Sequence, residues 1–253
     1  MLTSTPLSPA QFDDWKKHVV SCFPNEACAY IVNDVIMPVA NRSDEPKNKF
    51  AVSVMDRFEA NKGIISGFLH SHCLTPRQAT DHIYPIHWPS TADMHGWMAD
   101  NTRWGVSGCD GQEVSEPIWL DNNTLAPLEG RPFIHGIWDC YAAMRDWFRV
   151  EKNVILPNFA RGMEWWMKGQ DLYADNFEKV GFVTIDEADV VPGDCGLMKD
   201  PRSGIISHIV VITSDNQIFH HAFSRNGQQL SGYADRGRWS RHIDKYIRYT
   251  PQH

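Results

Sequence analysis

Two histidines separated by a single residue, His70 and His72, are the first side chains in the sequence that suggest chemistry. They follow an apolar run, residues 63–69, that is typical of a buried strand. Because side chains alternate along an extended chain, both imidazoles are expected on one side, where they can chelate a metal ion. A zinc hydrolase usually supplies three protein ligands and keeps one position for water, whose pKa falls to about 7. Asp93, one helical turn after Ser90, is the expected third ligand.

A second candidate site combines a cysteine with two histidines later in the chain. Cys140 follows Asp139, which can cap a helix, and a helix N-terminus lowers the pKa of a thiol. His208 and His220 are expected on two adjacent strands, where one imidazole can act as a base and the other can orient it. His221 stays open as the alternative to His220. Taken singly, each residue also fits a structural role, such as an inert buried thiol or a histidine at the end of a strand.

Local patterns indicate the elements that would carry the first site. Residues 8–11, Ser-Pro-Ala-Gln, predict a helix start with a capping box, and the apolar positions that follow keep helical spacing. The β-rich runs 27–32 and 35–39 are separated by Asn33-Asp34, a pair that favours a hairpin. Glu26 stands directly before the first of these strands. The acid is therefore expected in the same half of the chain as the histidine pair.

The C-terminal half shows a different order of elements. A helix is predicted from Cys140 to about Val150, with its apolar side chains on one face. Strands are expected at residues 182–185, 208–213 and 217–221, with a tight turn between the last two. The segment from Asp121 to Arg131 contains Asn, Pro and Gly without periodicity, and we interpret it as a linker. A chain of 253 residues suits two domains, here residues 1–124 and 125–253, of the α+β class.

Composition excludes several classes of function. A net charge of -7 without clustered Lys or Arg argues against a nucleic-acid-binding surface. No apolar stretch approaches the ~18 residues that a membrane helix requires. The six cysteines form no CxxC pair, which favours reduced thiols, and the first residues lack the basic and apolar regions of a secretory signal. The chain is therefore expected in the cytoplasm, without a membrane span or a nucleic-acid partner.

Three blocks of the N-terminal half occur in an order that resembles the JAMM/MPN metalloproteases. The blocks are Pro24-Asn25-Glu26-Ala27-Cys28, then His70-Ser71-His72, then Pro89-Ser90-Thr91-Ala92-Asp93. The resemblance implies a mixed sheet with flanking helices and a zinc ion bound by His70, His72 and Asp93. It also implies that Glu26 is the general base for the zinc-bound water and that Ser90 donates a hydrogen bond to the developing oxyanion.

The sequence departs from the JAMM/MPN pattern between the second and third blocks. The intervening segment, Cys73 to Trp88, is long, and Cys73 stands where the family often has proline. Asp81, His82 and His87 within this segment are alternative ligands if the geometry differs.

Four motifs of the C-terminal half resemble the NlpC/P60 cysteine peptidases, which have a papain-like fold. The motifs are Asp139-Cys140-Tyr141, Pro192-Gly193-Asp194, His208-Ile209-Val210-Val211-Ile212 and Ile218-Phe219-His220. The resemblance implies that Cys140 is the nucleophile, His208 the general base and acid, and His220 or His221 the orienting residue. The Cys140 backbone N–H would donate to the oxyanion. The glycine-rich stretch that often precedes the cysteine is replaced by residues 133–138, in which His135 and Trp138 are substitutes for the substrate cradle.

The two parts together, in this order, resemble the lambda-type tail tip assembly proteins of phages over nearly the full length. The resemblance implies other tail tip proteins as partners and peptidoglycan stem peptides or a tail protein as the substrate. It places the protein in the host cytoplasm during assembly and at the virion tail tip, acting on the periplasmic cell wall, during infection. A non-catalytic scaffold in the tail tip and a stand-alone JAMM isopeptidase are the alternatives.

Overall fold

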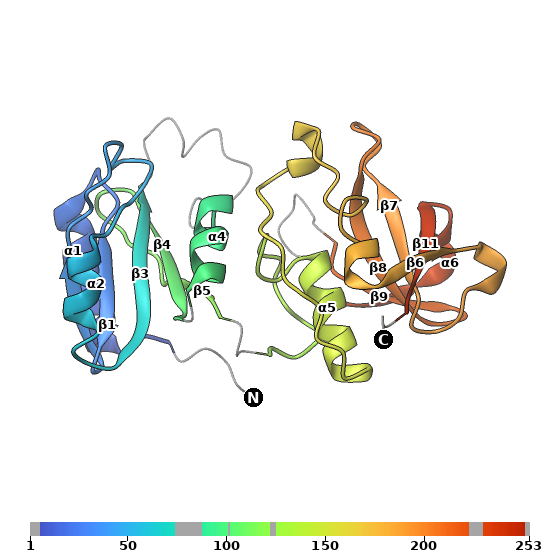
Figure 1. Ribbon diagram of the computed structural model, residues 1–253, viewed down its shortest axis with the longest axis horizontal. Coiled ribbons are helices and arrows are strands. Elements are labelled where there is room, and N and C mark those ends of the chain that lie inside the picture. The colour runs from blue at the N-terminus through green and yellow to red at the C-terminus, as the bar shows by residue number, and fades with distance from the viewer. Residues whose placement is uncertain (1–5, 74–87, 101, 122–124, 223–229, 251–253) are drawn as a thin grey trace. The chain divides into compact units, whose positions relative to one another are not determined.

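The computed structural model describes residues 6–73, 88–100, 102–121, 125–222 and 230–250. The chain divides into two compact units between Leu125 and Ala126. Each unit contains one sheet with its own helices, and the predicted α+β class is confirmed (Figure 1). Within the described residues, no helix is both long enough and apolar enough to cross a bilayer.

The N-terminal unit is built on a mixed five-stranded sheet of order β2-β1-β3-β4-β5. Its elements are α1 (Pro9–Cys22), β1 (Cys28–Val32), β2 (Val35–Val39), α2 (Val54–Ala60), β3 (Ile65–Cys73), α4 (Thr91–Ala99), β4 (Trp104–Cys109) and β5 (Ile118–Leu120). The strands β3 and β4 run parallel, and every other neighbouring pair is antiparallel. The crossover between the parallel strands β3 and β4 contains α4.

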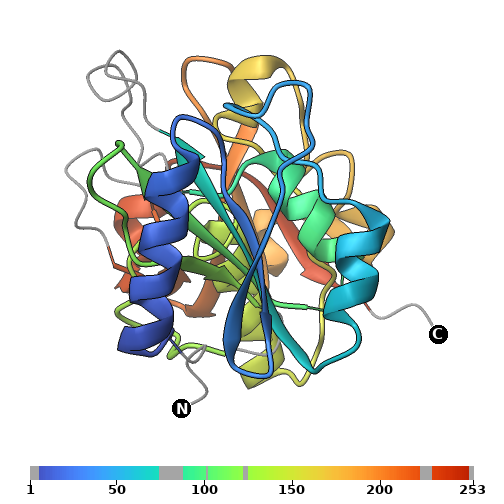
Figure 2. The ribbon, with the colours of Figure 1, turned by 90° about the vertical axis from the view of Figure 1, so that its left-hand side faces the viewer.

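Helices cover both faces of this first sheet (Figure 2). Trp15 and Val19 of α1 are fully buried against one face, in a cluster with Ile31 and Leu69. The opposite face carries α2 and α4, and the close approach of α4 is visible at Gly96, where an added Cβ would meet the Trp104 ring at 2.5 Å. The strand between these layers, β3, is therefore buried on both sides.

The predicted helix start and the predicted hairpin are confirmed, but the predicted end of β3 is wrong. The predicted capping box is present, because Ser8 and Gln11 each accept a hydrogen bond from the other's backbone N–H. The hairpin is confirmed as well, with Asn33 and Asp34 at positive φ between β1 and β2. The histidines, however, lie within β3 and not after it. Pairing with β1 on one side and β4 on the other keeps the chain extended to Cys73.

The C-terminal unit is built on a six-stranded antiparallel sheet of order β10-β9-β8-β7-β11-β6. Its elements are α5 (Cys140–Glu151), η1 (Trp165–Lys168), η2 (Glu178–Val180), β6 (Phe182–Ile185), η3 (Glu187–Asp189), β7 (Cys195–Lys199), β8 (Ile206–Ser214), β9 (Gln217–His220), β10 (Gly232–Asp235), α6 (Arg236–Ser240) and β11 (Ile243–Tyr249). The helix predicted from Cys140 and the three predicted strands are confirmed within a few residues.

The two faces of the second sheet carry separate apolar clusters. The cluster on the α5 side contains Trp147 and Phe148 together with Ile209 and Val211 of β8. The cluster on the other side contains Val210 and Ile212, with Trp239 of α6 packed against it. Figure 1 shows the two helices on opposite sides of the sheet. Alternate residues of β8 thus belong to different layers of the unit.

The second half of the predicted linker belongs to the C-terminal unit. Arg131 is buried and donates to the carbonyl oxygens of Ala126 and Pro127 and to the carboxylate of Asp146 in α5. Its backbone also bonds to Ser231, the residue before β10. These bonds anchor residues 126–131 to the second sheet.

Two candidate catalytic sites

Backbone pairing between β1 and β3 brings the first candidate residues together. Cys28 is the cross-strand partner of His70. The Ala27 N–H donates to the Ser71 hydroxyl at 2.9 Å, and the Ser71 N–H donates to the Ala27 carbonyl at 3.1 Å. Continued by two residues, the same register places Glu26 opposite His72. Because strand side chains alternate, Glu26, His70 and His72 share the face of the sheet covered by α4.

A helix cap delivers Asp93 to the same place. Ser90 is the N-cap of α4, and its Oγ accepts a hydrogen bond from the Asp93 N–H at 3.2 Å. In return, the Ser90 N–H donates to Oδ2 of Asp93 at 2.7 Å. This reciprocal capping box holds the carboxylate at the start of the helix, pointing back towards β3.

The three donor groups converge closely enough to share one metal ion. The Nε2 atoms of His70 and His72 lie 3.3 Å apart, and each lies 3.1 Å from one oxygen of Asp93. Among the described residues, this is the group of three or more potential metal ligands whose donor atoms lie within 4.8 Å of one another. In a tetrahedral zinc site with bonds of about 2.0–2.1 Å, ligand atoms are about 3.3 Å apart. The donor set therefore fits zinc in both chemistry and spacing.

Packing and electrostatics prepare these groups to act as ligands. The ring of His70 is fully buried and lies 4.6 Å from the Phe50 ring, and its Nδ1 has no hydrogen-bond partner among the described residues. Burial lowers the pKa of His70, which keeps its imidazole neutral. Burial acts to raise the pKa of Asp93, but the two imidazoles hold it well below its usual value. A neutral imidazole at His70 beside an ionised carboxylate matches the protonation states that metal binding requires.

Glu26 has the protonation behaviour of a general base. Its side chain is 6% exposed, and burial raises its pKa to about 7, with His72 acting to lower it and Asp93 to raise it. A base is most effective when its pKa lies near the working pH. Ser90 is exposed, and its hydroxyl hydrogen is not used by the helix cap. The alternative ligands Asp81, His82 and His87 lie outside the described residues.

The second candidate nucleophile stands at the predicted helix N-terminus but has a different partner. Asp139 caps α5 through the Ala142 N–H, which makes Cys140 the first helical residue. The Cys140 thiol lies 3.3 Å from the Tyr173 hydroxyl and 3.9 Å from the Ser207 carbonyl, directly before His208. No hydrogen bond joins Cys140 to His208, although both lie in the described part of the chain.

The pKa of the Cys140 thiol is raised, although a helix N-terminus was expected to lower it. Burial raises the pKa of Cys140 to about 11, and the charge of Asp139 acts in the same direction. The hydrogen bond from Tyr173 acts to lower it. Burial, together with the capping carboxylate, thus acts against the activation of the sulfur that the sequence suggested for a helix N-terminus. At neutral pH the thiol is protonated in this arrangement.

The candidate imidazoles pair with each other. Nε2 of His208 lies 3.3 Å from Nδ1 of His220. Burial, reinforced by neighbouring histidines, lowers the pKa of His208 to about 3 and that of His220 to about 4, so both rings are neutral. His221 points to the other side of the strand, where its buried ring meets Phe133 edge-on at 5.1 Å. The structure therefore brings His220, and not His221, to His208.

The thiol and the imidazole contact different side chains at the same end of β8. His208 is the cross-strand partner of Met198, which belongs to the same cluster as Val210, and its ring lies 5.9 Å from that of Trp239. Cys140 packs against the cluster on the α5 side. Both groups are near the same end of the strand, because the sulfur contacts Ser207.

Sequence patterns did not indicate two residues that complete the surroundings of Cys140. Arg161, in an irregular segment, donates from Nε at 2.6 Å and from a terminal nitrogen at 2.8 Å to the buried carboxylate of Asp139. Tyr173 supplies the hydroxyl beside the sulfur. A buried capping carboxylate signals that a cation must lie nearby. The spacing of residues in the sequence does not indicate which cation this is.

Two motif residues have structural partners. Asp194 is buried, and its carboxylate accepts two hydrogen bonds from Arg248 at 2.8 Å. His135 is buried as well, with Nε2 2.9 Å from the Gly162 carbonyl. These bonds give both side chains a structural role: Asp194 binds a residue of β11, and His135 binds the irregular segment.

Comparison with known proteins identifies two phage relatives. The chain is 33% identical to tail tip assembly protein K of Escherichia phage lambda over 123 residues, which cover 49% of this chain and 56% of the relative. It is 23% identical to tail tip assembly protein K of Escherichia phage N15 over 241 residues, covering 92% and 91% of the two chains. The match thus spans little more than half of the lambda protein. No protein-family model matches the chain.

Solved structures show only a distant likeness. A lipoprotein of the NLP/P60 family from Staphylococcus aureus aligns at a TM-score of 0.35 with 16% identity, covering 49% of this chain and 38% of the other. An NlpC/P60 family protein from Bacillus cereus aligns at 0.32 with 10% identity, covering 93% and 67%. TM-scores in this range do not establish a common fold.

Proposed function

We propose that this chain, a homologue of the tail tip assembly proteins K of phages lambda and N15, is a tail tip assembly protein with peptidase activity. Its N-terminal unit is a JAMM-type hydrolase that cuts a peptide or isopeptide bond. The observation that carries this proposal is the convergence of His70, His72 and Asp93 within hydrogen-bonding distance of one another. Two neighbours support the proposal: Glu26, opposite His72 in the strand register, is the proposed base, and Ser90, which caps the helix of Asp93, is the proposed oxyanion donor.

Each residue of the first site has a separate task. Zinc bound by the three donor groups would lower the pKa of a water molecule and polarise the substrate carbonyl. Glu26, with a pKa raised to about 7, accepts the water proton on a carboxylate oxygen and later passes it to the leaving nitrogen. The Ser90 hydroxyl donates to the oxygen that gains negative charge. The capping box holds Asp93 while these protons move.

Metal content tests the first site directly. Purified protein is expected to hold about one zinc ion per chain, measured by mass spectrometry of the dissolved metal. His70→Ala should lose the metal because two donors rarely retain it. His95→Ala is the matched control, since His95 is exposed on the same helix as Asp93. Equal zinc in both variants, or none taken up by the unaltered protein, would refute the metallohydrolase.

A cysteine peptidase in the C-terminal unit is the second candidate function. The observation that favours it is the thiol of Cys140 at a helix N-terminus, with Tyr173 beside it and the His208–His220 pair at the same end of β8. Catalytic hydrogen bonds commonly tighten only when the substrate is bound. The proposed substrate is a stem peptide of the bacterial cell wall, cut at the tail tip during infection.

Phage carrying single substitutions separate catalysis from assembly. Cys140→Ala and His70→Ala phage should assemble in the host cytoplasm with the other tail tip proteins. The peptidase proposal requires that at least one of them infects poorly. Normal assembly and infection by both would favour a scaffold without turnover. Incubation of the purified protein with peptidoglycan, followed by mass spectrometry of the released peptides, identifies the bond that is cut.

A further inference from the structure

The hydroxyl of Tyr173 is held beside the Cys140 sulfur by the packing of its ring. The residue is buried in the α5-side cluster, and the centroid of its ring lies 5.9 Å from that of Trp165 and 6.1 Å from that of Tyr141. Its backbone is fixed as well, because the Tyr173 carbonyl accepts the N–H of Phe177 at 2.9 Å. Among the residues that the structure describes, the hydroxyl bonds only to the sulfur, at 3.3 Å.

A backbone N–H at the start of α5 is a second donor near the sulfur. The first N–H groups of a helix have no partner within the helix. The Asp139 carboxylate accepts the N–H groups of Ala142 and Gly136, one on each oxygen. The N–H of Cys140 itself donates to no residue in the described part of the chain. It is therefore available to a group that approaches the sulfur.

The attack of a thiolate on a carbonyl moves negative charge from sulfur to oxygen. A thiolate carries no hydrogen, so in the reactive form of Cys140 the tyrosine donates and the sulfur accepts. When the sulfur bonds to the carbonyl carbon, an electron pair of the C=O bond moves to the oxygen, two bonds from the sulfur. The O–H of Tyr173 can then turn from the sulfur to that oxygen. The Ser207 carbonyl, 3.9 Å from the sulfur, has no hydrogen to donate.

The proton of Tyr173 stays on its oxygen during this change of partner. Burial, and then the charge of Cys140, raises the pKa of Tyr173 well above its ordinary value of 10.0. The hydroxyl is therefore a donor that does not ionise at neutral pH. Donors that are already in place, and shielded from water, act most strongly on the charge that develops in a reaction.

We propose that Tyr173 is a catalytic residue of the second site, whose hydroxyl donates to the substrate carbonyl oxygen as this oxygen gains charge. The N–H of Cys140 is the other donor. The inference rests on the proposed cysteine peptidase. In that reaction the sulfur–carbon bond forms, the carbon–nitrogen bond breaks, and the thiol proton passes through His208 to the leaving nitrogen. Tyr173 transfers no proton and acts only on the oxygen.

Two reactions of the same thiolate separate this role from an effect on the thiol. Acylation by the p-nitrophenyl ester of acetyl-alanine forms a negatively charged carbonyl oxygen, whereas alkylation by iodoacetamide does not. Both are followed on the full chain at one mildly alkaline pH, and mass spectrometry assigns the product to Cys140. Tyr173→Phe should slow acylation about a hundredfold and alkylation only about fivefold, so the ratio of the two rates should fall about twentyfold.

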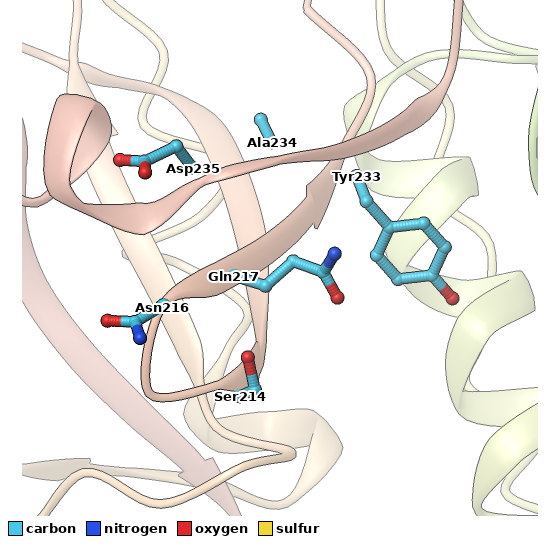
Figure 3. A pocket seen from close by; sticks show the side chains of 6 residues that line it. All are labelled: Ser214, Asn216, Gln217, Tyr233, Ala234 and Asp235. Carbon is cyan, nitrogen blue, oxygen red and sulfur yellow. The ribbon is translucent and has the colours of Figure 1, made fainter.

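Two other tyrosines of the same unit supply matched controls. Tyr141→Phe removes a hydroxyl that donates to the Pro157 carbonyl at 2.8 Å. Tyr233→Phe removes a hydroxyl from β10, where the ring lines a hollow of about 400 Å³ (Figure 3). In the described structure neither hydroxyl bonds to the Cys140 sulfur. Both variants should therefore keep the rate ratio of the unaltered protein.

A thionoester probe tests the same contact without any substitution, which matters if Tyr173→Phe does not fold. Its C=S group places the negative charge on sulfur, which accepts hydrogen bonds more weakly than oxygen does. Free acetyl-cysteine is the reference nucleophile. Compared with this free thiol, the unaltered protein should prefer the oxygen ester about tenfold more strongly.

The outcomes distinguish this inference from the peptidase proposal. An unchanged rate ratio in Tyr173→Phe, or an equal preference for the oxygen ester in the protein and the free thiol, would each overturn the role of Tyr173. Acylation of Cys140 in the unaltered protein would then still support the peptidase. Absence of any acylation at Cys140 would overturn both proposals.

Discussion

In the N-terminal unit, the candidate ligands lie on a strand and a helix cap whose positions are set by backbone hydrogen bonds. His70 and His72 belong to β3, which pairs on both sides, and Asp93 is held by the N–H of Ser90. In the C-terminal unit, Cys140 lies on a helix and His208 on a strand, and among the described residues no backbone-to-backbone hydrogen bond joins these two elements. The first set of donors lies within 3.3 Å, whereas the second pair is not hydrogen-bonded.

This difference shows what the backbone can and cannot determine about a site. Strand register and helix caps determine which side chains face one another. Packing of a helix on a sheet leaves the choice of partner to the side chains, and here Tyr173 reaches the sulfur while His208 bonds to His220. The second site therefore depends on its buried framework more than the first, whose three donor groups already converge.

The largest effect is expected at the buried ion pair below Cys140. Arg161→Met leaves the buried Asp139 carboxylate with backbone N–H donors but without its cation, and should destabilise the C-terminal unit by about 3–5 kcal/mol. Lys199→Met breaks an exposed pair with Asp244 in the same sheet and should cost less than about 1 kcal/mol. Hydrogen exchange of each unit measures both losses. Comparable losses in the two variants would contradict the importance assigned to the buried pair.

Lowering the pH should reduce the loss in free energy of unfolding that Arg161→Met causes. In the folded protein, burial acts to raise the pKa of Asp139, but Arg161 holds it well below its usual value. The stabilisation from this ion pair is therefore present above about pH 3.9, the ordinary pKa of Asp, and is lost as the pH falls below it. Without Arg161, burial raises the pKa of Asp139, so the variant gains stability as the pH falls. Denaturant titrations at pH 7 and pH 4.5 should show a smaller difference at the lower pH.

The sequence predicted what depends on near neighbours along the chain. The capping box of Ser8 and Gln11 and the cap of α5 by Asp139 each involve residues three positions apart, and each is present. The histidine pair was recognised from its alternation, but its strand was expected to end at residue 69. Pairing with β4 extends it, and β4 itself was not predicted, because Gly105 and Gly108 weaken its β pattern.

What the sequence left unpredicted depends on distant residues in irregular backbone. Arg161 and Tyr173 lie 22 and 33 residues beyond their partners. No periodic pattern indicates them, because most of the segment between α5 and β6 is irregular backbone without a repeating side-chain direction. The lack of a hydrogen bond between Cys140 and His208 could not be derived either, since it depends on how α5 packs on the sheet.

A smaller effect should separate the two roles of Ser90. Ser90→Ala removes both the helix cap and the proposed oxyanion donor. Ser53→Ala removes only a cap, because Ser53 accepts from the Asp56 N–H at the start of α2 in the same way. Each change should cost about 1 kcal/mol of stability. Only Ser90→Ala should slow peptide hydrolysis, by about a hundredfold, as is typical for an oxyanion donor.

Zinc content is the control for this comparison of serines. Ser90→Ala protein that keeps its zinc but turns over slowly would place the hydroxyl in the reaction. Loss of zinc together with activity would instead mean that Ser90 acts only by holding Asp93. Equal rates for the two serine variants would remove Ser90 from the mechanism altogether.

The smallest effect is expected from the hydroxyl beside the sulfur. Tyr173→Phe removes a hydrogen bond of about 1 kcal/mol, which should raise the pKa of Cys140 and slow its alkylation about fivefold at a given alkaline pH below that pKa. Tyr141→Phe is the matched control, because the Tyr141 hydroxyl donates to the Pro157 carbonyl and not to the thiol. The pH profile of iodoacetamide labelling, read at Cys140 by mass spectrometry, compares them. Faster labelling of Cys140 in Tyr173→Phe would instead mean that the tyrosine shields the sulfur from the reagent. The second site would then open only when the tyrosine moves, whereas the donor groups of the proposed metal site already converge.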